Sequence, residues 1–460
     1  MPTLAEVRLW GRTIGAASLE ESAGVTSFQY APEFVGSGIE VAPLAMPLAA
    51  RSYSFPALPR ISFHGLPGLL ADSLPDRFGN ALIDAWLAGQ GRTPASFNAV
   101  ERLCYTGARG MGALEFVPVI APRLQRSEKV NVSALVALAS EILANRNGLS
   151  VSFVPQRRRE GLEEILRVGT SAGGARAKAI IAWNPDSNEV RSGQVSAPEG
   201  FGHWLLKFDG VRGNQDKELE DPQGYTVIEY AYSLMARDAG LEMTECRLLE
   251  ESGRRHFMTR RFDRTADGGK LHMQSLAALG HLDFNAAGAH SYEQAFDAIK
   301  RLGLPMSARE QQFRRMLFNV VARDQDDHVK NIAFLMDKTG RWSLAPAFDV
   351  TFSFNPQGAW TAHHQMTING KRERFELEDF RACARVAGLK RGRAETMLDE
   401  VSTVVAGWKG YAEQAGVSPQ WRAHIQATLQ LRFGSRAARR ARKTTGPSRR
   451  RATPGPKRSG

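Results

Sequence analysis

The chain has 460 residues, of which 43% are hydrophobic and 23% are charged, the make-up of a soluble globular protein with two or three domains. Its three cysteines, Cys104, Cys246 and Cys383, lie far apart and form no CxxC pair, which argues against a disulfide framework and a structural zinc site. No run approaches the roughly 18 apolar residues of a membrane helix, so we expect a cytoplasmic protein without membrane insertion.

The formal net charge of +12 comes from the C-terminal end. From Arg432 onward the chain carries eleven Lys or Arg residues and no Asp or Glu, so the remainder is close to neutral. A segment this poor in apolar residues cannot offset its chain entropy by burial, and we expect it to be disordered. Such a tail could attract nucleic-acid phosphates in a salt-sensitive way, or it could be a solvated terminus that happens to be basic.

Short apolar runs broken by turn residues dominate the first part of the chain. Apolar alternation on both sides of Gly11 indicates a β-hairpin over residues 6–16. Helical spacing of apolar residues predicts helices at 77–87 and 132–145, and the charged stretch 157–161 is typical of a connection.

The middle of the chain holds the most strand-like pair, at residues 178–183 and 203–208. A helix is expected at 226–239, and a second strand pair at 247–250 and 256–260 follows it. Beyond about residue 275 helical patterns dominate, at residues 292–302, 308–321, 377–387, 391–406 and 419–432. A strand-rich first part and a helix-rich second part favour a two-lobed α+β enzyme.

Three glycines among small residues precede the first of these strands, in the segment 168–178. Glycine lets backbone amides approach a phosphate closely, so the segment is a candidate phosphate cradle. It does not match the Walker pattern, because no Gly-Lys-Ser or Gly-Lys-Thr closes it and a strand follows in place of a helix. An ordinary turn remains the alternative.

Lys207 ends an otherwise apolar strand, where an unpaired ammonium would be costly. Kinases use such a strand lysine to hold ATP phosphates and orient it with a glutamate from the following helix, a role that Glu229 could fill. The alternative is an edge-strand lysine and a solvent-facing glutamate.

The segment from Asp326 to Asn331 places several polar groups between an apolar helix and an apolar strand, and Asp349 follows it. Kinases use this spacing for a carboxylate that accepts the hydroxyl proton, a metal-binding amide and a second metal-binding carboxylate. Lys330 could neutralise charge on the moving phosphoryl group. A solvated polar loop is the alternative for this segment.

A competing interpretation takes Asp327 and His328 as part of a hydrolase metal centre, to which the pair His363-His364 could contribute. Further histidines at suitable spacing are missing, which weakens that interpretation. The kinase interpretation is favoured because five elements occur in the expected order: a Gly-rich loop, a strand lysine, a helix glutamate, an Asp-to-Asn loop and a final aspartate.

Four segments resemble the HipA-like serine/threonine kinases. Residues Ser171 to Lys178 are similar to the family's Ser-x-x-Gly-Ala-x-x-Lys loop, and Arg261-Phe262-Asp263-Arg264 is similar to its interlobe motif. The stretch Asp326-x-His328-x-Lys330-Asn331 resembles its catalytic loop, and residues 63–76 resemble its N-terminal subdomain. The likeness runs from near the start to about residue 430.

The resemblance implies a two-lobed protein-kinase-like (PI3/4-kinase-related) fold, with a strand-rich N-terminal lobe and an all-helical C-terminal lobe. It implies four segments: a HipA-like N-terminal subdomain (1–125), the rest of the N-lobe (126–270), a helical C-lobe (271–432) and a disordered basic tail (433–460).

The resemblance also implies residue roles. The cofactors would be ATP and Mg²⁺, with Asn331 and Asp349 as metal ligands and Asp326 as the catalytic base, supported by His328 and Lys330. Ser171 matches the family serine whose autophosphorylation expels its loop and silences the enzyme. The nucleotide-contacting residues would be Ser171, Ala172, Gly173, Gly174, Lys178, Lys207, Glu229, Arg260 and Phe262.

As a family member, the chain would be the toxin of a type II toxin–antitoxin pair and would phosphorylate a serine on a translation factor, in known members an aminoacyl-tRNA synthetase. Its partner would be a small HipB-like helix-turn-helix antitoxin that carries it to operator DNA, which the basic tail could also contact. The chain departs from the pattern at Arg176-Ala177, where well-known members have Gln-Glu, and at Arg260, where an acidic residue is often seen. A small-molecule or lipid kinase and a catalytically silent, DNA-bound corepressor are the alternatives.

Overall fold

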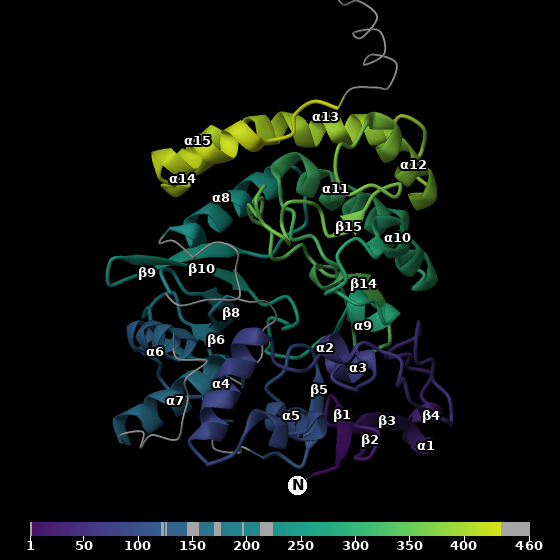
Figure 1. The fold of residues 1–460 in the computed structure, drawn as a ribbon, viewed down its shortest axis with the longest axis vertical. Helices are drawn as coiled ribbons and strands as arrows, with labels where there is room; N and C mark the ends of the chain where they lie inside the picture. Colours follow the sequence, from purple (N-terminus) through teal and green to yellow (C-terminus); the bar gives the residue numbers. More distant parts are fainter. Residues whose placement is uncertain are drawn as a thin grey trace, which may run out of the picture.

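The computed structural model describes residues 2–120, 124, 127–144, 156–169, 176–195, 197–211 and 224–433. In Figure 1 the described residues up to 211 lie in the strand-rich lower half, and most of the chain from residue 292 to 433 lies in the helix-rich upper half. The expectation of a mixed α/β chain is confirmed. Within the described ranges, no helix is long and apolar enough to cross a membrane.

The first sheet has five antiparallel strands in the order β4-β3-β2-β1-β5. The predicted hairpin is confirmed, because β1 pairs with β2 around Gly11, whose φ of +78° lies in the left-handed region that glycine adopts without strain. The strands are β1 (Leu4–Leu9), β2 (Arg12–Glu20), β3 (Val25–Tyr30), β4 (Ser52–Tyr53) and β5 (Leu114–Val117).

Five α-helices accompany this first sheet in the chain. The predicted helix at 77–87 is confirmed as α4, which begins after Asp76, an N-cap whose side chain accepts a hydrogen bond from the backbone N–H of Gly79. The helices are α1 (Pro32–Val35), α2 (Arg60–Phe63), α3 (Gly68–Ala71), α4 (Arg77–Ala88) and α5 (Ala99–Thr106), with a 3₁₀ turn at Pro94–Ser96.

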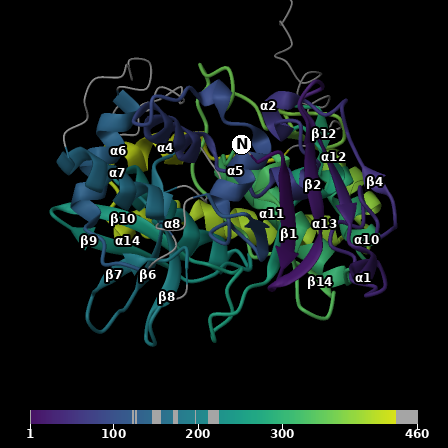
Figure 2. The ribbon, with the colours of Figure 1, turned by 90° about the horizontal axis from the view of Figure 1, so that it is seen from below.

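A second five-stranded antiparallel sheet has the order β7-β6-β8-β10-β9, and the two predicted strand pairs lie in it. Figure 2 shows the two sheets side by side when the molecule is seen from below. The strands are β6 (Lys178–Trp183), β7 (Val190–Ser192), β8 (Gly202–Lys207), β9 (Cys246–Glu251) and β10 (Arg254–Arg260).

Among the described residues of this second unit, the helices are α6 (Val132–Ala144), α7 (Gln156–Gly169) and α8 (Tyr225–Asp238). The interpretation of residues 157–161 as a connection is wrong, since they form the first turns of α7. The apolar residues that bury this helix, Ile165, Leu166 and Val168, come only after the charged stretch. A short sequence window therefore missed the amphipathic pattern.

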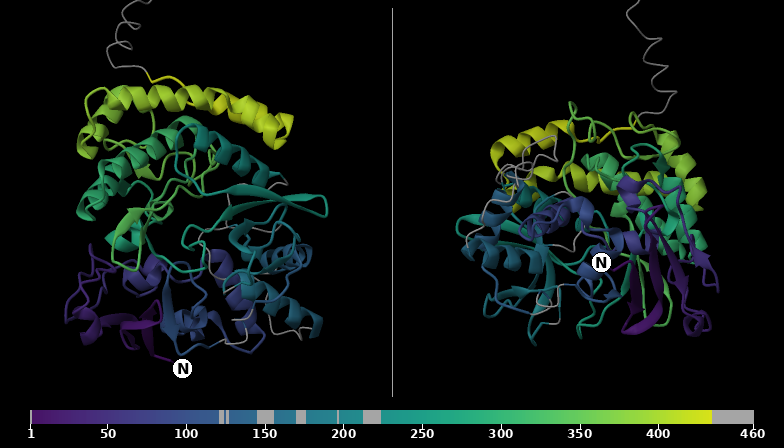
Figure 3. Two further views of the ribbon diagram at one scale, coloured as in Figure 1. Left: turned by 180° about the vertical axis from the view of Figure 1, so that it is seen from behind. Right: turned by 60° about the horizontal axis from the view of Figure 1, so that its bottom comes forward.

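The helix-rich part packs around the longest helix, α11, and the views in Figure 3 show its helices stacked above the sheets. Its helices are α9 (Leu276–Gly280), α10 (Tyr292–Arg301), α11 (Met306–Ala322), α12 (Leu377–Ala387), α13 (Arg393–Ala406), α14 (Trp408–Ala415) and α15 (Pro419–Thr428), with a 3₁₀ turn at Val329–Asn331. The last helix stops at Thr428, short of the predicted 432, because the backbone of Leu429 is extended.

The expectation of an all-helical C-terminal lobe is wrong. Two small sheets lie within residues 271–432, one with the order β11-β13-β14 and the other pairing β12 with β15. Their strands are too short to give a clear apolar alternation in the sequence: β11 (His272–Ser275), β12 (His290–Ser291), β13 (Ala333–Met336), β14 (Trp342–Leu344) and β15 (Met366–Thr367). The central strand β13 follows the Asp326 segment directly and so anchors it.

A buried charge cluster ties the interlobe motif to the N-terminal part. The Asp263 side chain is fully buried and accepts hydrogen bonds from the guanidinium groups of Arg261 (2.7 and 2.8 Å) and Arg264 (2.8 Å). It also accepts a 2.7 Å bond from the backbone N–H of Gly112. Burial alone would raise the pKa of Asp263, but the two guanidinium groups hold it below its ordinary value. The motif Arg261 to Arg264 therefore has a structural role, which is to connect this part of the chain to the N-terminal part.

Candidate active site

Lys207 and Glu229 form a buried ion pair where the second sheet meets the helix-rich part. The Lys207 Nζ lies 2.5 Å from Glu229 Oε1, and their side chains are 7% and 2% exposed. Strand β8 is internal to its sheet, so the alternative of an edge-strand lysine and a solvent-facing glutamate is wrong. The glutamate comes from α8, the helix that follows this strand, as the sequence predicts.

Asp349 forms a second ion pair with Lys207. The burial of Lys207 by itself would lower its pKa, but the two carboxylates raise it above the ordinary value, so the ammonium stays charged. The pKa of Asp349 is lowered in turn: burial opposes ionisation, but Lys207 and Lys178 outweigh it. The backbone of Asp349 has a φ of +57°, a left-handed conformation that is uncommon for non-glycine residues and occurs often at functional sites.

The loop that carries Asp326 begins where α11 ends, at Arg323, whose φ of +63° turns the chain sharply. Asp324, the next residue, is buried and accepts a 2.7 Å hydrogen bond from Ser353 Oγ. The same serine oxygen accepts a bond of 3.1 Å from the backbone N–H of Asp326. Burial and neighbouring carboxylates raise the pKa of Asp324 well above its ordinary value. This residue therefore orders the loop and is not exposed for chemistry.

Asp326 itself faces an open environment, since 43% of its side chain is exposed. Its Oδ1 accepts a 2.6 Å hydrogen bond from the indole N–H of Trp360 and lies 3.8 Å from Nε2 of His328. The amide nitrogen of Asn331 donates a 3.0 Å bond to the backbone carbonyl of Asp326. This bond holds Asn331 close to Asp326 and leaves its amide oxygen as the atom that can accept or ligate.

Asp327 has a structural position. Its buried carboxylate accepts hydrogen bonds from Tyr292 OH (2.8 Å) and the backbone N–H of Gln365 (2.7 Å), and it pairs with His364 Nδ1 at 2.8 Å. The neighbouring His363 lies elsewhere, 3.5 Å from Glu373. In the part of the chain that the structure describes, no three His, Cys, Asp or Glu side chains are placed to hold a metal together. The hydrolase metal centre is therefore not supported.

Of the remaining predicted site residues, Lys330 and Phe262 lie near other site residues and Arg260 does not. Lys330 Nζ lies 4.7 Å from the ring centroid of Phe284, whose ring is also 6.1 Å from that of His328. The ring of Phe262 is tilted against that of Phe348, the residue before Asp349, at a centroid distance of 5.5 Å, and the two rings pack against the same small apolar cluster. Arg260 points to solvent, with 51% of its side chain exposed and an ion pair of 3.9 Å to Glu245, so the structure does not bring it to the other site residues.

The predicted phosphate-cradle residues Ser171, Ala172, Gly173 and Gly174 lie outside the described residues, as does the basic tail from residue 434. Lys178 is described, and its Nζ lies 3.2 Å from Asp76 Oδ2. Two further residues border the site. The guanidinium of Arg176 lies over the Tyr225 ring at 3.5 Å and is 4.0 Å from Glu229. The indole of Trp360 is hydrogen-bonded to Asp326. No sequence pattern predicts a role for Asp76 or Trp360, and Arg176 is marked in the sequence only as a departure from the family loop.

The donor set suits a magnesium ion. Hard divalent cations prefer carboxylate and amide oxygens, and Asp349 is ionised while its side chain keeps 32% exposure. The amide oxygen of Asn331 supplies the second ligand type. We therefore retain Asn331 and Asp349 as the candidate ligands.

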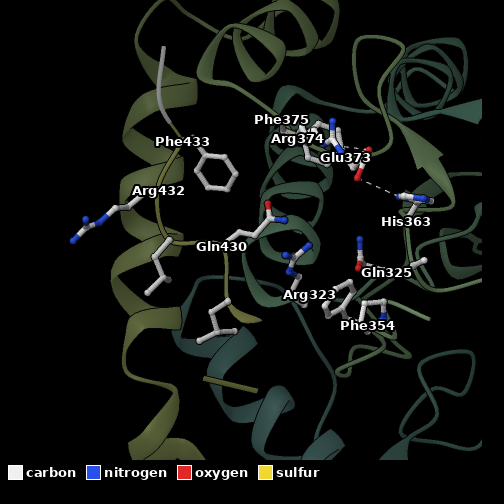
Figure 4. Close-up of a pocket in the computed structure, with 14 residues that line it drawn as sticks. Arg323, Gln325, Phe354, His363, Glu373, Arg374, Phe375, Gln430, Arg432 and Phe433 are labelled. Atoms are coloured by element: carbon white, nitrogen blue, oxygen red, sulfur yellow. Dashed lines mark ion pairs between the residues drawn. The ribbon is translucent and has the colours of Figure 1, made fainter. Parts of the chain in front are cut away.

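A separate hollow lies in the helix-rich part, between the segment after α15 and the stretch around Phe354 and Phe375. Figure 4 shows Arg323, Gln325 and Gln430 lining it, with Phe433 at its edge. None of the residues predicted to bind nucleotide or metal lines this hollow. The hollow is therefore separate from the charged cluster of Lys207, Glu229 and Asp349.

The fold and the cluster define a class: a mixed α/β protein that gathers a doubly paired lysine and an Asp-to-Asn loop between its strand-rich and helix-rich parts. The HipA-like C-terminal domain model matches residues 170–408, and the HipA N-terminal domain model matches residues 5–117. The chain therefore belongs to the HipA family.

One solved structure shares the fold over most of the chain. The Shewanella oneidensis MR-1 toxin–antitoxin complex of HipA, HipB and operator DNA contains a chain with a TM-score of 0.64 and 18% identity, covering 92% of this chain and 95% of that one. The Helicobacter pylori proinflammatory kinase CtkA reaches a TM-score of 0.37 with 11% identity, over 56% of this chain and 88% of that chain. A search of curated proteins found no match.

Proposed function

We propose that this chain is an ATP- and Mg²⁺-dependent protein serine/threonine kinase on a two-lobed protein-kinase-like scaffold. The observation that carries the proposal is the bridging of Lys207 between Glu229 and Asp349. A phosphate-binding lysine that is oriented by a helix glutamate and lies next to a metal-binding aspartate is the arrangement that phosphoryl transfer requires.

Each residue has a separate task in this proposal. The Lys207 ammonium binds phosphate oxygens, and Glu229 keeps that ammonium in place. Asp326 accepts the proton of the attacking hydroxyl through Oδ2, because the Trp360 indole N–H donates to Oδ1. Asn331 and Asp349 would hold Mg²⁺, which would neutralise charge on the phosphates. Positioning and electrostatics supply most of the rate enhancement in such reactions.

The first experiment is the intact mass of the purified chain after incubation with Mg²⁺ and ATP, beside a Ser171→Ala variant. We expect the parent to gain one phosphate and the variant to gain none, because Ser171 matches the family's autophosphorylated serine. A gain in both would place the phosphate elsewhere. No gain in a parent that starts unphosphorylated would contradict a protein kinase that modifies itself and would favour a small-molecule or lipid kinase.

We further propose that the chain is the toxin of a toxin–antitoxin module with a HipB-like helix-turn-helix antitoxin, and that it acts on a translation factor such as an aminoacyl-tRNA synthetase. The support is family membership and the shared fold with HipA from a complex that contains HipB and operator DNA. The HipB-like partner would bring the chain to operator DNA.

The basic C-terminal segment provides a test of direct DNA contact. We expect the intact chain to bind duplex DNA with an affinity that falls steeply as salt rises, because eleven Lys or Arg residues follow Leu431. A chain that ends at Leu431 should lose this binding in a titration followed by fluorescence anisotropy. Equal binding by the two chains would contradict a role for the tail and leave the antitoxin as the DNA-binding component.

A further inference from the structure

Two buried lysines face each other at the candidate site. In the antiparallel pair β6–β8, Lys178 lies directly opposite Lys207, so both side chains lie on the same face of the sheet. They are 3% and 7% exposed. Like charges directly opposite each other destabilise a sheet, and burial strengthens the repulsion. Two charged lysines can therefore be buried at these positions only if each is paired with a carboxylate.

Lys207 has Glu229 and Asp349, whereas Lys178 has Asp76, whose side chain is 4% exposed. The charged groups that interact electrostatically with Lys178 are Asp76, Asp349 and Lys207. Asp76 also interacts electrostatically with Lys330. The partner of Lys178 thus comes from the start of α4, about a hundred residues earlier in the chain.

The two oxygens of Asp76 have different partners. Oδ1 accepts a 2.6 Å hydrogen bond from the backbone N–H of Gly79 and caps α4, whereas Oδ2 faces Lys178 at 3.2 Å. Asparagine caps a helix as well as aspartate does, so capping alone does not require a buried negative charge. A buried carboxylate is costly unless it is paired, and Lys178 is the partner that justifies the charge here.

We propose that Asp76 is a positioning residue for nucleotide binding: it holds the Lys178 ammonium beside that of Lys207, so that two cations face the polyphosphate. The inference rests on the proposed kinase function and assigns to the N-terminal subdomain a part in the nucleotide site, exerted through Lys178. Glu229 and Asp76 would then act in parallel, one for each lysine.

The test measures dissociation constants for two probes, a non-hydrolysable ATP analogue with Mg²⁺ and adenosine, on the full-length chain. Asp76→Asn keeps the helix cap and removes the charge. We expect its dissociation constant for the ATP analogue to rise about tenfold, the scale of one charged hydrogen bond, and that for adenosine to stay within about twofold. Lys178→Met should show the same selective loss, and adding Asp76→Asn to it should cause no further loss.

A purely structural role for Asp76 would weaken both probes alike, and that result, or unchanged binding of the analogue, would overturn the inference while the kinase proposal stands. A parent chain that binds neither probe would overturn both. If Asp76→Asn does not fold, the comparison of Lys178→Met with the double variant decides, because the double variant contains neither buried charge. Weaker analogue binding by the double variant would then refute the coupling.

Discussion

Replacing Asp326 by asparagine is expected to slow phosphate incorporation about a thousandfold without unfolding the protein, the scale of a lost general base. Asparagine has nearly the same shape, and its side-chain oxygen can still accept the hydrogen bond from Trp360. It cannot accept the proton of the attacking hydroxyl. The measurement is the time course of intact mass with Mg²⁺ and ATP, together with the thermal unfolding temperature.

The matched control for this variant is Asp337→Asn. Asp337 is another partly exposed loop aspartate in the helix-rich part, and it pairs with Arg341 away from the cluster. We expect the control to incorporate phosphate at the parent rate. An Asp326→Asn variant that keeps more than about a tenth of the parent rate would exclude general-base catalysis by this residue.

Replacing Lys207 by methionine is expected to weaken binding of the ATP analogue about 100-fold. The substitution removes the cation that faces the phosphates and leaves Glu229 and Asp349 without their shared partner, so two carboxylates then repel the incoming anion. Lys207→Arg is expected to restore little of this loss, because a planar guanidinium does not fit between two carboxylates that now contact one compact ammonium. Titration calorimetry would measure the dissociation constant of the ATP analogue for both variants.

Lys270→Met is the control for Lys207→Met. Lys270 is also largely buried, with 23% of its side chain exposed, and it pairs with Glu115 at 2.8 Å on the N-terminal sheet. Its loss should leave analogue binding unchanged. Equal weakening by the two variants would mean that removing any buried lysine disturbs the site indirectly, and the role assigned to Lys207 would fall.

Much of the fold could be predicted because long periodic segments carry their own signal. The hairpin at 6–16, the helix at 77–87 and the strand pair at 178–183 and 203–208 all occur in the structure. The errors arose where local pattern is weak. The polar start of α7 hid a helix, and strands of two to four residues such as β15 are too short for alternation to be seen. Such strands exist because neighbouring segments pair with them.

In the candidate site, too, the sequence predicted some features and missed others. The order of Lys207, Glu229, Asp326, Asn331 and Asp349 along the chain was enough to suggest phosphoryl transfer, and the structure brings Lys207 into contact with both Glu229 and Asp349. The partners of these residues were not foreseeable. No spacing rule links Trp360 to Asp326, because a hydrogen bond between them depends on how a loop folds back.

Residue types and spacing were sufficient to suggest phosphoryl-transfer chemistry, because an ammonium, a carboxylate and an amide each have few uses when they occur together. Spatial pairing could not be read in this way. Asp76 and Lys178 lie about a hundred positions apart, and whether their charges meet depends on how α4 packs beside the second sheet. Burial makes this ion pair important for stability, because a charged side chain in the interior is strongly destabilising without a partner, whereas the same side chain on the surface is not.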